Sequence, residues 1–295
     1  MNFVVLTDSS GNLQKRQIQN NDLKVIPFPY YVEGKEFTCT DSEAFSGDSF
    51  YKRIRDGLRV TTSQINPAQY MAFFEPWLKG GKDIILVTMS SGISGACNAA
   101  HMAAAMLLER YAERRIEIID SLGASLGEGI LALQAARLRD LGKTVTEAAE
   151  ELRTRAKRMF NVFTVDDLMH LKRGGRLSNL SAIVGMVLNI KPLLKGNEEG
   201  KIVAFSKIRG RKKSIESLAR AYETLAVAPE EQIVGIAQAG CREDATYLEQ
   251  LLRRICPPKE ILTVEYEPVT GSHVGPGALA LFFEGKEDVR SVISF

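Results

Sequence analysis

The sequence is poor in the residues that build disulfides and metal sites. Its 295 residues include four cysteines and three histidines. The cysteines are scattered and form no C-x-x-C pair, which indicates reduced thiols and a cytoplasmic protein. The histidines lack the spacing of metal ligands, so the sequence predicts neither a zinc site nor a bound cofactor.

Long apolar runs and a strong charge of one sign are also absent. No run of 18 apolar residues occurs, which argues against a membrane span. The first eight residues have the pattern of a buried strand and not that of a signal peptide. The net charge of +2 is too small to indicate a nucleic acid or a membrane surface as partner.

Two common nucleotide-binding patterns are missing. Neither G-x-G-x-x-G nor G-x-x-x-x-G-K-[ST] occurs, and the glycines at 123–129 have a different spacing. The composition, 45% hydrophobic and 25% charged, is that of a soluble globular protein. The length suffices for two domains of about 150 residues each, and we expect domains at 1–158 and 159–295.

The first half of the chain has the pattern of a parallel α/β domain. Short apolar runs at 3–6, 84–87 and 116–120 are typical of buried strands and alternate with helical stretches. This alternation predicts a parallel sheet with helices on its faces. The stretch from Lys24 to Val32 contains two prolines and is predicted to form one edge strand.

The second half also alternates between strands and helices. Its strands are predicted at 160–165, 190–194, 202–208, 233–238, 261–265 and 278–283. An almost wholly apolar helix is expected at 182–188, which faces either the core or an apolar ligand, with the core as the default.

One junction between a strand and a helix has the composition of an anion site. Between the strand at 84–87 and a helix predicted at 96–108 lie three serines and two glycines: Ser90, Ser91, Gly92, Ser94 and Gly95. The glycines allow close approach of the backbone, and the free N–H groups of a helix start attract a negative group. The alternative is that Ser94 is an ordinary N-cap.

Further polar side chains follow other strands. Thr61, Thr62 and Ser63 form a predicted extended loop before a helix that Asn66 caps. Such hydroxyl clusters are usually solvated turns. Asp8 ends the first strand and either polarises a ligand hydroxyl or caps the next turn, and the cap is the favoured alternative.

Of the three histidines, His273 is the best candidate for a functional residue. It lies between three glycines and a proline in the segment 270–277, which predicts a tightly shaped loop. His101 and His170 are in ordinary helical patterns and are expected to be structural.

Two basic segments are candidates for contacts. Residues 171–178 place cations around two glycines, which suits a bound anion or, slightly better, an ordinary helix C-terminus. The cations at 209–213 precede a helix predicted at 214–225 and oppose its dipole. Most such runs are solvated surface, but this unfavourable placement makes the docking of a partner a second hypothesis.

Ser94, His273 and Asp8 also suggest a hydrolase. However, residues 92–96 have the sequence G-I-S-G-A, which is not the G-x-S-x-G elbow. Several hydroxyls with one imidazole suit the binding of a carboxylate, because each donates a hydrogen bond that is stronger to a charged acceptor. Binding therefore accounts for more of these residues than hydrolysis.

Five segments, in their order along the chain, resemble the DegV family. They are Thr7-Asp8-Ser9-Ser10, Thr62-Ser63-Gln64, Ser90–Gly95, Leu171–Ser178 and Gly271–Gly277. The resemblance extends from end to end, with a departure at 65–67, where many members place proline directly after the glutamine. It implies an α/β fold of two domains, with a parallel sheet in the N-terminal domain and a mixed sheet in the C-terminal domain. A long-chain fatty acid is expected between them.

The resemblance also implies a role. Such proteins are the fatty-acid-binding subunit of a bacterial fatty acid kinase and are not themselves enzymes. They present the carboxylate of an acid such as palmitate, stearate or oleate to a separate ATP-using subunit, which makes an acyl phosphate for phospholipid synthesis. Transient contact with the membrane fits this role.

Residue roles follow from the same resemblance by position. Thr62 and Ser94 would bind the carboxylate with His273 beside it, and the neighbours of this group would be Thr61, Ser63 and Ser91. The surface for the kinase subunit would include Arg209, Arg211 and Lys212. The alternative is an enzyme, either a Ser/His hydrolase or a phosphotransferase, since dihydroxyacetone kinases resemble this fold and use a histidine.

Overall fold

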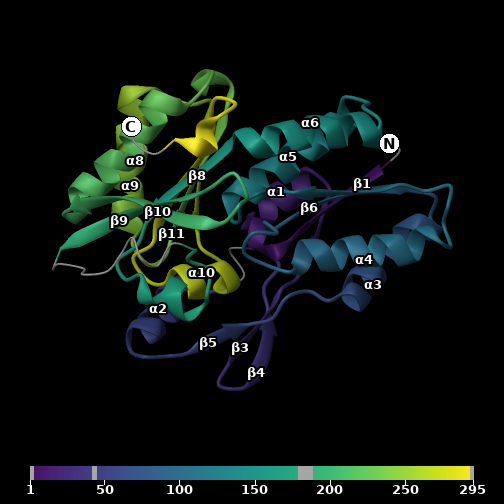
Figure 1. Cartoon of the computed structure of the whole chain (residues 1–295), viewed down its shortest axis with the longest axis horizontal. Helices are drawn as coiled ribbons and strands as arrows, with labels where there is room; N and C mark the ends of the chain where they lie inside the picture. The colour runs from purple at the N-terminus through teal and green to yellow at the C-terminus, as the bar shows by residue number, and fades with distance from the viewer. Residues whose placement is uncertain (1–2, 42–44, 179–188, 293–295) are drawn as a thin grey trace.

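The computed structural model describes residues 3–41, 45–178 and 189–292. Two large sheets lie side by side in this part of the chain, and a third, small sheet lies below them in Figure 1. Both large sheets carry helices, so the predicted α/β class is confirmed.

The first large sheet is parallel throughout, as predicted. Its strand order is β2-β1-β6-β7. The strands are β1 (Phe3–Asp8), β2 (Leu23–Ile26), β6 (Asp83–Thr88) and β7 (Ile116–Asp120). β1 is buried along its whole length, which is expected of a strand that helices cover on both faces.

Four long helices cover the first sheet, and the short α1 (Lys15–Asn20) lies beside β2. The four are α3 (Pro67–Lys79), α4 (Ala96–Leu108), α5 (Leu126–Asp140) and α6 (Val145–Arg158). α3 and α4 pack together on one face, and α5 and α6 on the other (Figure 1). Asn66 caps α3 as predicted, since its Oδ1 accepts a hydrogen bond of 2.9 Å from the N–H of Gln69.

The second large sheet is mixed, as the resemblance implies. Its order is β10-β9-β8-β13-β11-β12, and of these pairs β11 with β12 is parallel and the others antiparallel. The strands are β8 (Met159–Thr164), β9 (Ile190–Gly196), β10 (Ile202–Arg209), β11 (Ile233–Gln238), β12 (Glu260–Glu265) and β13 (Leu279–Glu284). α8 (Arg211–Leu225) and α9 (Arg242–Ile255) cover one face.

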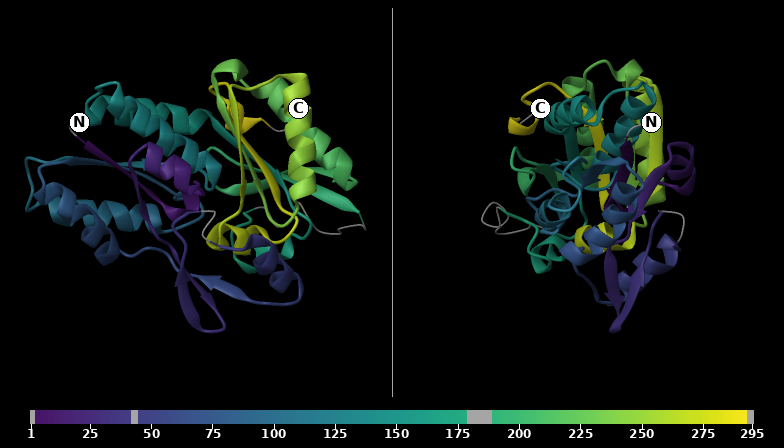
Figure 2. Two further views of the ribbon diagram at one scale, coloured as in Figure 1. Left: turned by 180° about the vertical axis from the view of Figure 1, so that it is seen from behind. Right: turned by 90° about the vertical axis from the view of Figure 1, so that its right-hand side faces the viewer.

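The other face of the mixed sheet meets the N-terminal half of the chain. A Cβ on Gly235 of β11 would lie 2.7 Å from the Cβ of Leu126, so the first turn of α5 packs directly on this strand. Phe163 and Phe282 share a hydrophobic core with Leu126. Figure 2 shows the two sheets from behind with α5 between them. No helix of the described residues is long and apolar enough to span a membrane.

The prediction of one edge strand from Lys24 to Val32 is wrong. The chain leaves the first sheet after β2, which is an edge strand, and enters a small antiparallel sheet of order β4-β3-β5. Its strands are β3 (Pro29–Val32), β4 (Lys35–Thr38) and β5 (Val60–Thr62). The ladder between β1 and β2 ends at Ile26, directly before Pro27, which has no N–H to donate. Thr61 and Thr62, which were expected in a loop, lie in β5.

Two further expectations need correction. The predicted loop at 270–277 is largely helical, because α10 (Pro268–Val274) begins at a cap in which the Glu267 carboxylate accepts the N–H groups of Val269 and Thr270. The cations at 211–213 lie inside α8 and not before it. The apolar helix predicted at 182–188 lies outside the described residues.

A buried carboxyl pair joins the end of β1 to α5. Asp8 caps the turn that follows, as predicted, through the N–H of Ser10 at 3.0 Å. The Ser10 hydroxyl lies 2.5 Å from Asp8 Oδ1 and 2.6 Å from Glu128 Oε2. Burial raises the pKa of Asp8, and burial together with the charge of Asp8 raises the pKa of Glu128 well above its ordinary range. Two like charges at this spacing are unfavourable, so the pair holds a proton.

This pair predicts that stability falls as the pH rises above the unfolded pKa of glutamate. The native state holds a proton that the unfolded chain releases above about pH 4.5, so alkaline conditions favour unfolding. Glu128→Gln should therefore reduce the loss of unfolding free energy between about pH 5 and about pH 8, measured by urea titration. Glu113→Gln, on the exposed surface, should keep the wild-type slope. Equal slopes for wild type and Glu128→Gln would contradict the assignment.

Candidate functional site

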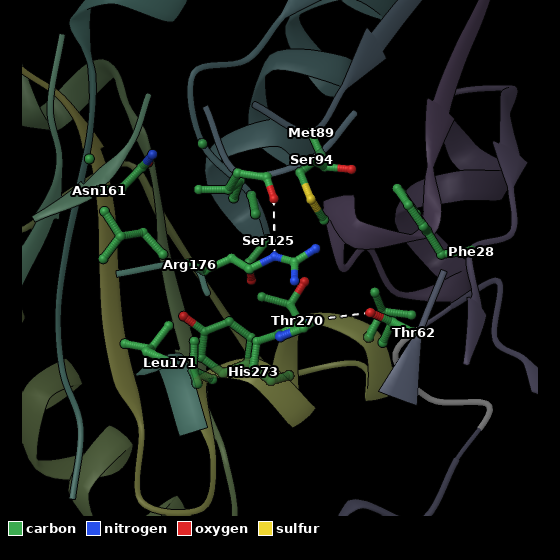
Figure 3. Close-up of a pocket in the computed structure, with 18 of the residues that line it drawn as sticks. Phe28, Thr62, Met89, Ser94, Ser125, Asn161, Leu171, Arg176, Thr270 and His273 are labelled. Carbon is green, nitrogen blue, oxygen red and sulfur yellow. Dashed lines mark hydrogen bonds between the residues drawn. The ribbon is translucent and has the colours of Figure 1, made fainter. Parts of the chain in front are cut away.

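A cavity lies between the two halves of the chain, and the space between its lining atoms, part of which is open to solvent, is about 850 Å³. Apolar side chains make a large part of its described lining, and Figure 3 shows Phe28, Met89 and Leu171 among them. The apolar lining residues are Phe28, Met89, Ile93, Leu122, Ala124, Phe163, Leu171, Ile202, Val269, Val274 and Phe282.

Thr62 and His273 meet at one end of this cavity. Thr62 ends β5, and His273 is in the last turn of α10. Thr62 Oγ1 and His273 Nε2 are 2.8 Å apart and share a hydrogen bond (Figure 3). Burial, and secondarily the charge of Arg176, lower the pKa of His273 to about 4. The imidazole is therefore neutral near pH 7.

Ser94 also lines the cavity, from the loop between β6 and α4. Its Oγ accepts a hydrogen bond of 3.2 Å from the N–H of Ala96, the first residue of α4. This bond resembles that of an N-cap, which was the alternative role for Ser94. The residue that flanks α4 is Gly95, which has no side chain to cap it. Accepting this bond leaves the hydroxyl hydrogen of Ser94 for a ligand.

Arg176 brings a positive charge to the cavity, and it belongs to the basic segment 171–178, for which a bound anion was one of the two expectations. α7 (Met169–Arg173) ends at two glycines, and Gly175 takes φ +70°, which returns the chain toward the cavity. The half-buried guanidinium donates from Nε to the Ile93 carbonyl at 3.2 Å and from Nη1 to the Gly174 carbonyl. Arg176 is the one arginine or lysine among the described lining residues.

Thr270 is a lining residue to which the sequence assigned no role. Its half-buried side chain lines the cavity, and its Oγ1 is buried without a hydrogen-bond partner in the described part of the chain. Figure 3 places it between Arg176 and Thr62. No sequence signal separates it from other residues of 270–277, because its position depends on α10.

Thr61, Ser63 and Ser91 were expected beside the carboxylate-binding residues, but they contribute less to the lining of the cavity. Ser63 lines the cavity, but Thr61 and Ser91 are not among the lining residues, and all three are exposed. The N–H of Ser91 donates to the carboxylate of Asp120 at 3.2 Å. These positions are at the rim and not around the Thr62–His273 pair.

The basic residues at 209–212 differ in their exposure and in their ion pairs. Arg209 is exposed at the end of β10. Arg211 is held by Asp244, with Nη2 and Oδ2 2.8 Å apart, and its Nη1 is 3.8 Å from Asp166. Lys212 is exposed, with Nζ 5.7 Å from the ring centroid of Tyr247.

The structure does not assemble the hydrolase arrangement in its described residues. His273 Nε2 is bonded to Thr62 and not to Ser94. Asp8 is 1% exposed and binds Ser10, Thr88 and the Met89 N–H instead of the histidine. No group of three or more His, Cys, Asp or Glu in the described residues is placed to hold a metal.

Comparison with known proteins confirms the resemblance to the DegV family. The model of the DegV family, described as a family of uncharacterised proteins, matches residues 2–286. A DegV domain-containing protein of Clostridium perfringens is 36% identical over 283 residues, which cover 96% of this chain and 97% of the relative.

Two solved structures are similar over nearly the whole length. A DegV family protein from Thermus thermophilus, described by its fatty acid binding, has a TM-score of 0.87 at 27% identity, covering 97% of this chain and 100% of that one. DegV of Bacillus subtilis, described as a fatty acid binding protein, has a TM-score of 0.83 at 30% identity with the same coverage.

The low pKa of His273 predicts a loss of stability in acid. Its folded pKa of about 4 lies below the unfolded value of 6.5, so the unfolded chain binds a proton first and stability falls as the pH drops between these values. From about pH 7.5 to about pH 5, His273 should cost the wild type up to about 2 kcal/mol. His273→Gln should remove that part of the loss in urea unfolding, whereas His101→Gln should not. An unchanged pH profile for His273→Gln would exclude a neutral, buried imidazole.

Proposed function

This chain belongs to the DegV family, and from that premise we propose that it binds a long-chain fatty acid in the cavity between its halves. The observation that supports this most strongly is the set of hydrogen-bond donors Thr62, Ser94, Arg176, Thr270 and His273 in a cavity whose lining also includes many apolar side chains. The two similar structures described as fatty acid binding support the same ligand class.

These donors provide what a buried carboxylate needs. An ionised group is costly to remove from water unless donors surround it. If the neutral imidazole carries its hydrogen on Nε2, His273 donates to Thr62 Oγ1, and the Thr62 hydroxyl hydrogen is left for the carboxylate. Ser94 and Thr270 offer two more hydroxyls, and Arg176 supplies the opposite charge. Hydrogen bonds to a charged acceptor are stronger than those between neutral groups.

The apolar lining provides the remaining affinity. Each buried CH₂ contributes about 0.8 kcal/mol, so a chain of the length of palmitate, stearate or oleate gains on the order of 10 kcal/mol before the cost of ordering it. Phe28, Phe163 and Phe282 form much of this surface.

We further propose that the protein is not itself an enzyme and presents the carboxylate to a separate fatty acid kinase subunit in the cytoplasm. The resulting acyl phosphate would supply phospholipid synthesis. The neutral His273 and the missing nucleotide motifs agree with a protein that holds the fatty acid, whose carboxylate accepts the phosphoryl group, while the separate subunit binds ATP. Arg209 and Lys212, which are exposed, are the better candidates for docking, because Asp244 holds Arg211.

Removal of single hydroxyls from this set of donors should weaken fatty acid binding. Thr62→Val and Ser94→Ala should each raise the Kd for oleate by about 10- to 100-fold, because a hydrogen bond to a charged group contributes about 1.5–3 kcal/mol. Isothermal titration after delipidation measures this. Thr61→Val makes the same chemical change at the exposed neighbour on β5 and should leave the Kd unchanged.

Two results would contradict this assignment. One is an effect of Thr61→Val as large as that of Thr62→Val. The other is turnover of an activated ester that disappears in Ser94→Ala, which would favour the hydrolase.

A charge reversal at Arg209 should separate docking from fatty acid binding. Arg209→Glu should abolish association with the ATP-binding fatty acid kinase subunit of the same organism, in size-exclusion chromatography, without changing the Kd for oleate. Lys15→Glu makes the same charge change on α1 and should have no effect. Unimpaired association of a doubly substituted Arg209→Glu/Lys212→Glu protein would place the kinase elsewhere.

A further inference from the structure

The turn between β9 and β10 is docked on the loop from which Ser94 reaches the cavity. This hairpin turn, residues 197–201, belongs to the C-terminal half of the chain, and the serine loop, residues 90–95, belongs to the N-terminal half. The Ser90 hydroxyl donates a hydrogen bond of 2.9 Å to the Gly200 carbonyl. One hydroxyl therefore joins the hairpin turn to the serine loop.

Two glycines allow this close approach. A Cβ on Gly200 would lie 2.0 Å from Ser90 Oγ, and a Cβ on Gly92 would lie 2.5 Å from the Glu199 carbonyl oxygen. Gly200 also has φ +69°, a conformation that glycine adopts without a steric penalty. The N–H of Gly92 donates to Ser90 Oγ at 3.1 Å, so the same hydroxyl also braces the serine loop from within. A side chain at position 200 would separate the turn from the loop.

The serine loop passes this contact on to Ser94. The Ser90 carbonyl accepts the N–H of Ile93 at 3.2 Å and that of Ser94 at 3.1 Å, so the loop is one tight turn that starts at Ser90. Ser90 is fully buried and is not among the described lining residues of the cavity. It therefore acts on a ligand through the residues that it positions and not through its own hydroxyl.

The hairpin turn has bonds of its own that keep its shape. The Asn197 carbonyl accepts the N–H of Gly200 at 3.0 Å, and Asn197 Oδ1 accepts the N–H of Lys201 at 2.8 Å. Arg290 Nη1 lies 3.4 Å from the Asn197 carbonyl and donates to it. A turn braced in this way presents the Gly200 carbonyl to Ser90 in one direction.

We propose that Ser90 and Gly200 are positioning residues for the fatty acid carboxylate, because the docked hairpin turn sets the direction in which Ser94 presents its hydroxyl. This rests on the proposed function and extends it to residues that the ligand does not touch. A hydrogen bond weakens steeply as its angle closes, so a small displacement of the serine loop suffices to weaken the bond from Ser94. Thr62 reaches the cavity from β5 and is independent of this contact.

Gly200→Ala tests the contact with a single methyl group. It should raise the Kd for oleate about tenfold, because separation of the turn from Ser90 weakens one hydrogen bond to a charged acceptor. Isothermal titration of the delipidated full-length protein measures this. Gly34→Ala is the matched control, since Gly34 also lies in a hairpin turn, has φ +79° and leaves a Cβ with nothing within 4 Å. It adds the same backbone strain without the clash and should change the Kd by less than about twofold.

Ser90→Ala gives a second, independent variant. It removes the hydroxyl that joins the turn to the loop and strains no backbone, so it keeps the test valid if Gly200→Ala does not fold. Thermal unfolding checks both variants. Ser90→Ala should raise the Kd for oleate by about three- to tenfold, as expected for the loss of neutral hydrogen bonds.

Double-mutant cycles separate positioning from a general loss of structure. In a Ser94→Ala background, Gly200→Ala and Ser90→Ala should each change the Kd by less than about twofold, because the hydroxyl that they position is already gone. In a Thr62→Val background they should keep most of their effect, since Thr62 is held by another sheet. A purely structural role predicts the same effect in both backgrounds.

The outcomes distinguish this proposal from the proposed function. If the wild type binds no oleate, both are overturned. If it binds oleate but Gly200→Ala and Ser90→Ala leave the Kd unchanged, the positioning role is overturned and fatty acid binding stands. The same conclusion follows if their effects are equally large with and without the Ser94 hydroxyl, or if Gly34→Ala weakens binding as much as Gly200→Ala.

Discussion

The hydrogen bond between Thr62 and His273 joins two distant parts of the chain at the lining of the cavity. Thr62 belongs to the small sheet, whereas His273 is on α10 beside the mixed sheet. Thr62 Oγ1 and His273 Nε2 are 2.8 Å apart, so the bond ties β5 to α10 directly. Everything that fixes α10 against the N-terminal half therefore also fixes the site.

Side chains from the first quarter of the chain hold α10 in place. Asn12 accepts the N–H of Glu267 at 2.6 Å and donates to the Glu265 carbonyl at 2.8 Å. Tyr51, from α2 (Gly47–Arg55), donates to the Tyr266 carbonyl at 2.6 Å. A Cβ on Gly271 would lie 2.0 Å from the Tyr51 hydroxyl, so only glycine allows this approach. The glycines around His273 thus serve close packing and not a flexible loop.

The sequence predicts the helices and strands well, but it predicts poorly which distant segments come into contact. The parallel strands and Asn66 follow from local patterns, since apolar periodicity and caps act within a few residues. The break at Pro27 separates β2 from β3, which belong to different sheets. No local sequence pattern indicates which sheet a strand joins. The basic segment 171–178 was one candidate for an anion, but the sequence could not place Arg176 or Thr270 at the cavity. These two residues reach it through a glycine turn and a helix cap that bring distant segments together.

The charges at the proposed site suit an anionic ligand. Arg176 is the one arginine or lysine among the described lining residues, and these residues include no carboxylate to pair with it. A ligand carboxylate placed there offsets the charge of Arg176 and raises the pKa of His273, and it pairs with a half-buried cation that backbone carbonyls otherwise hold.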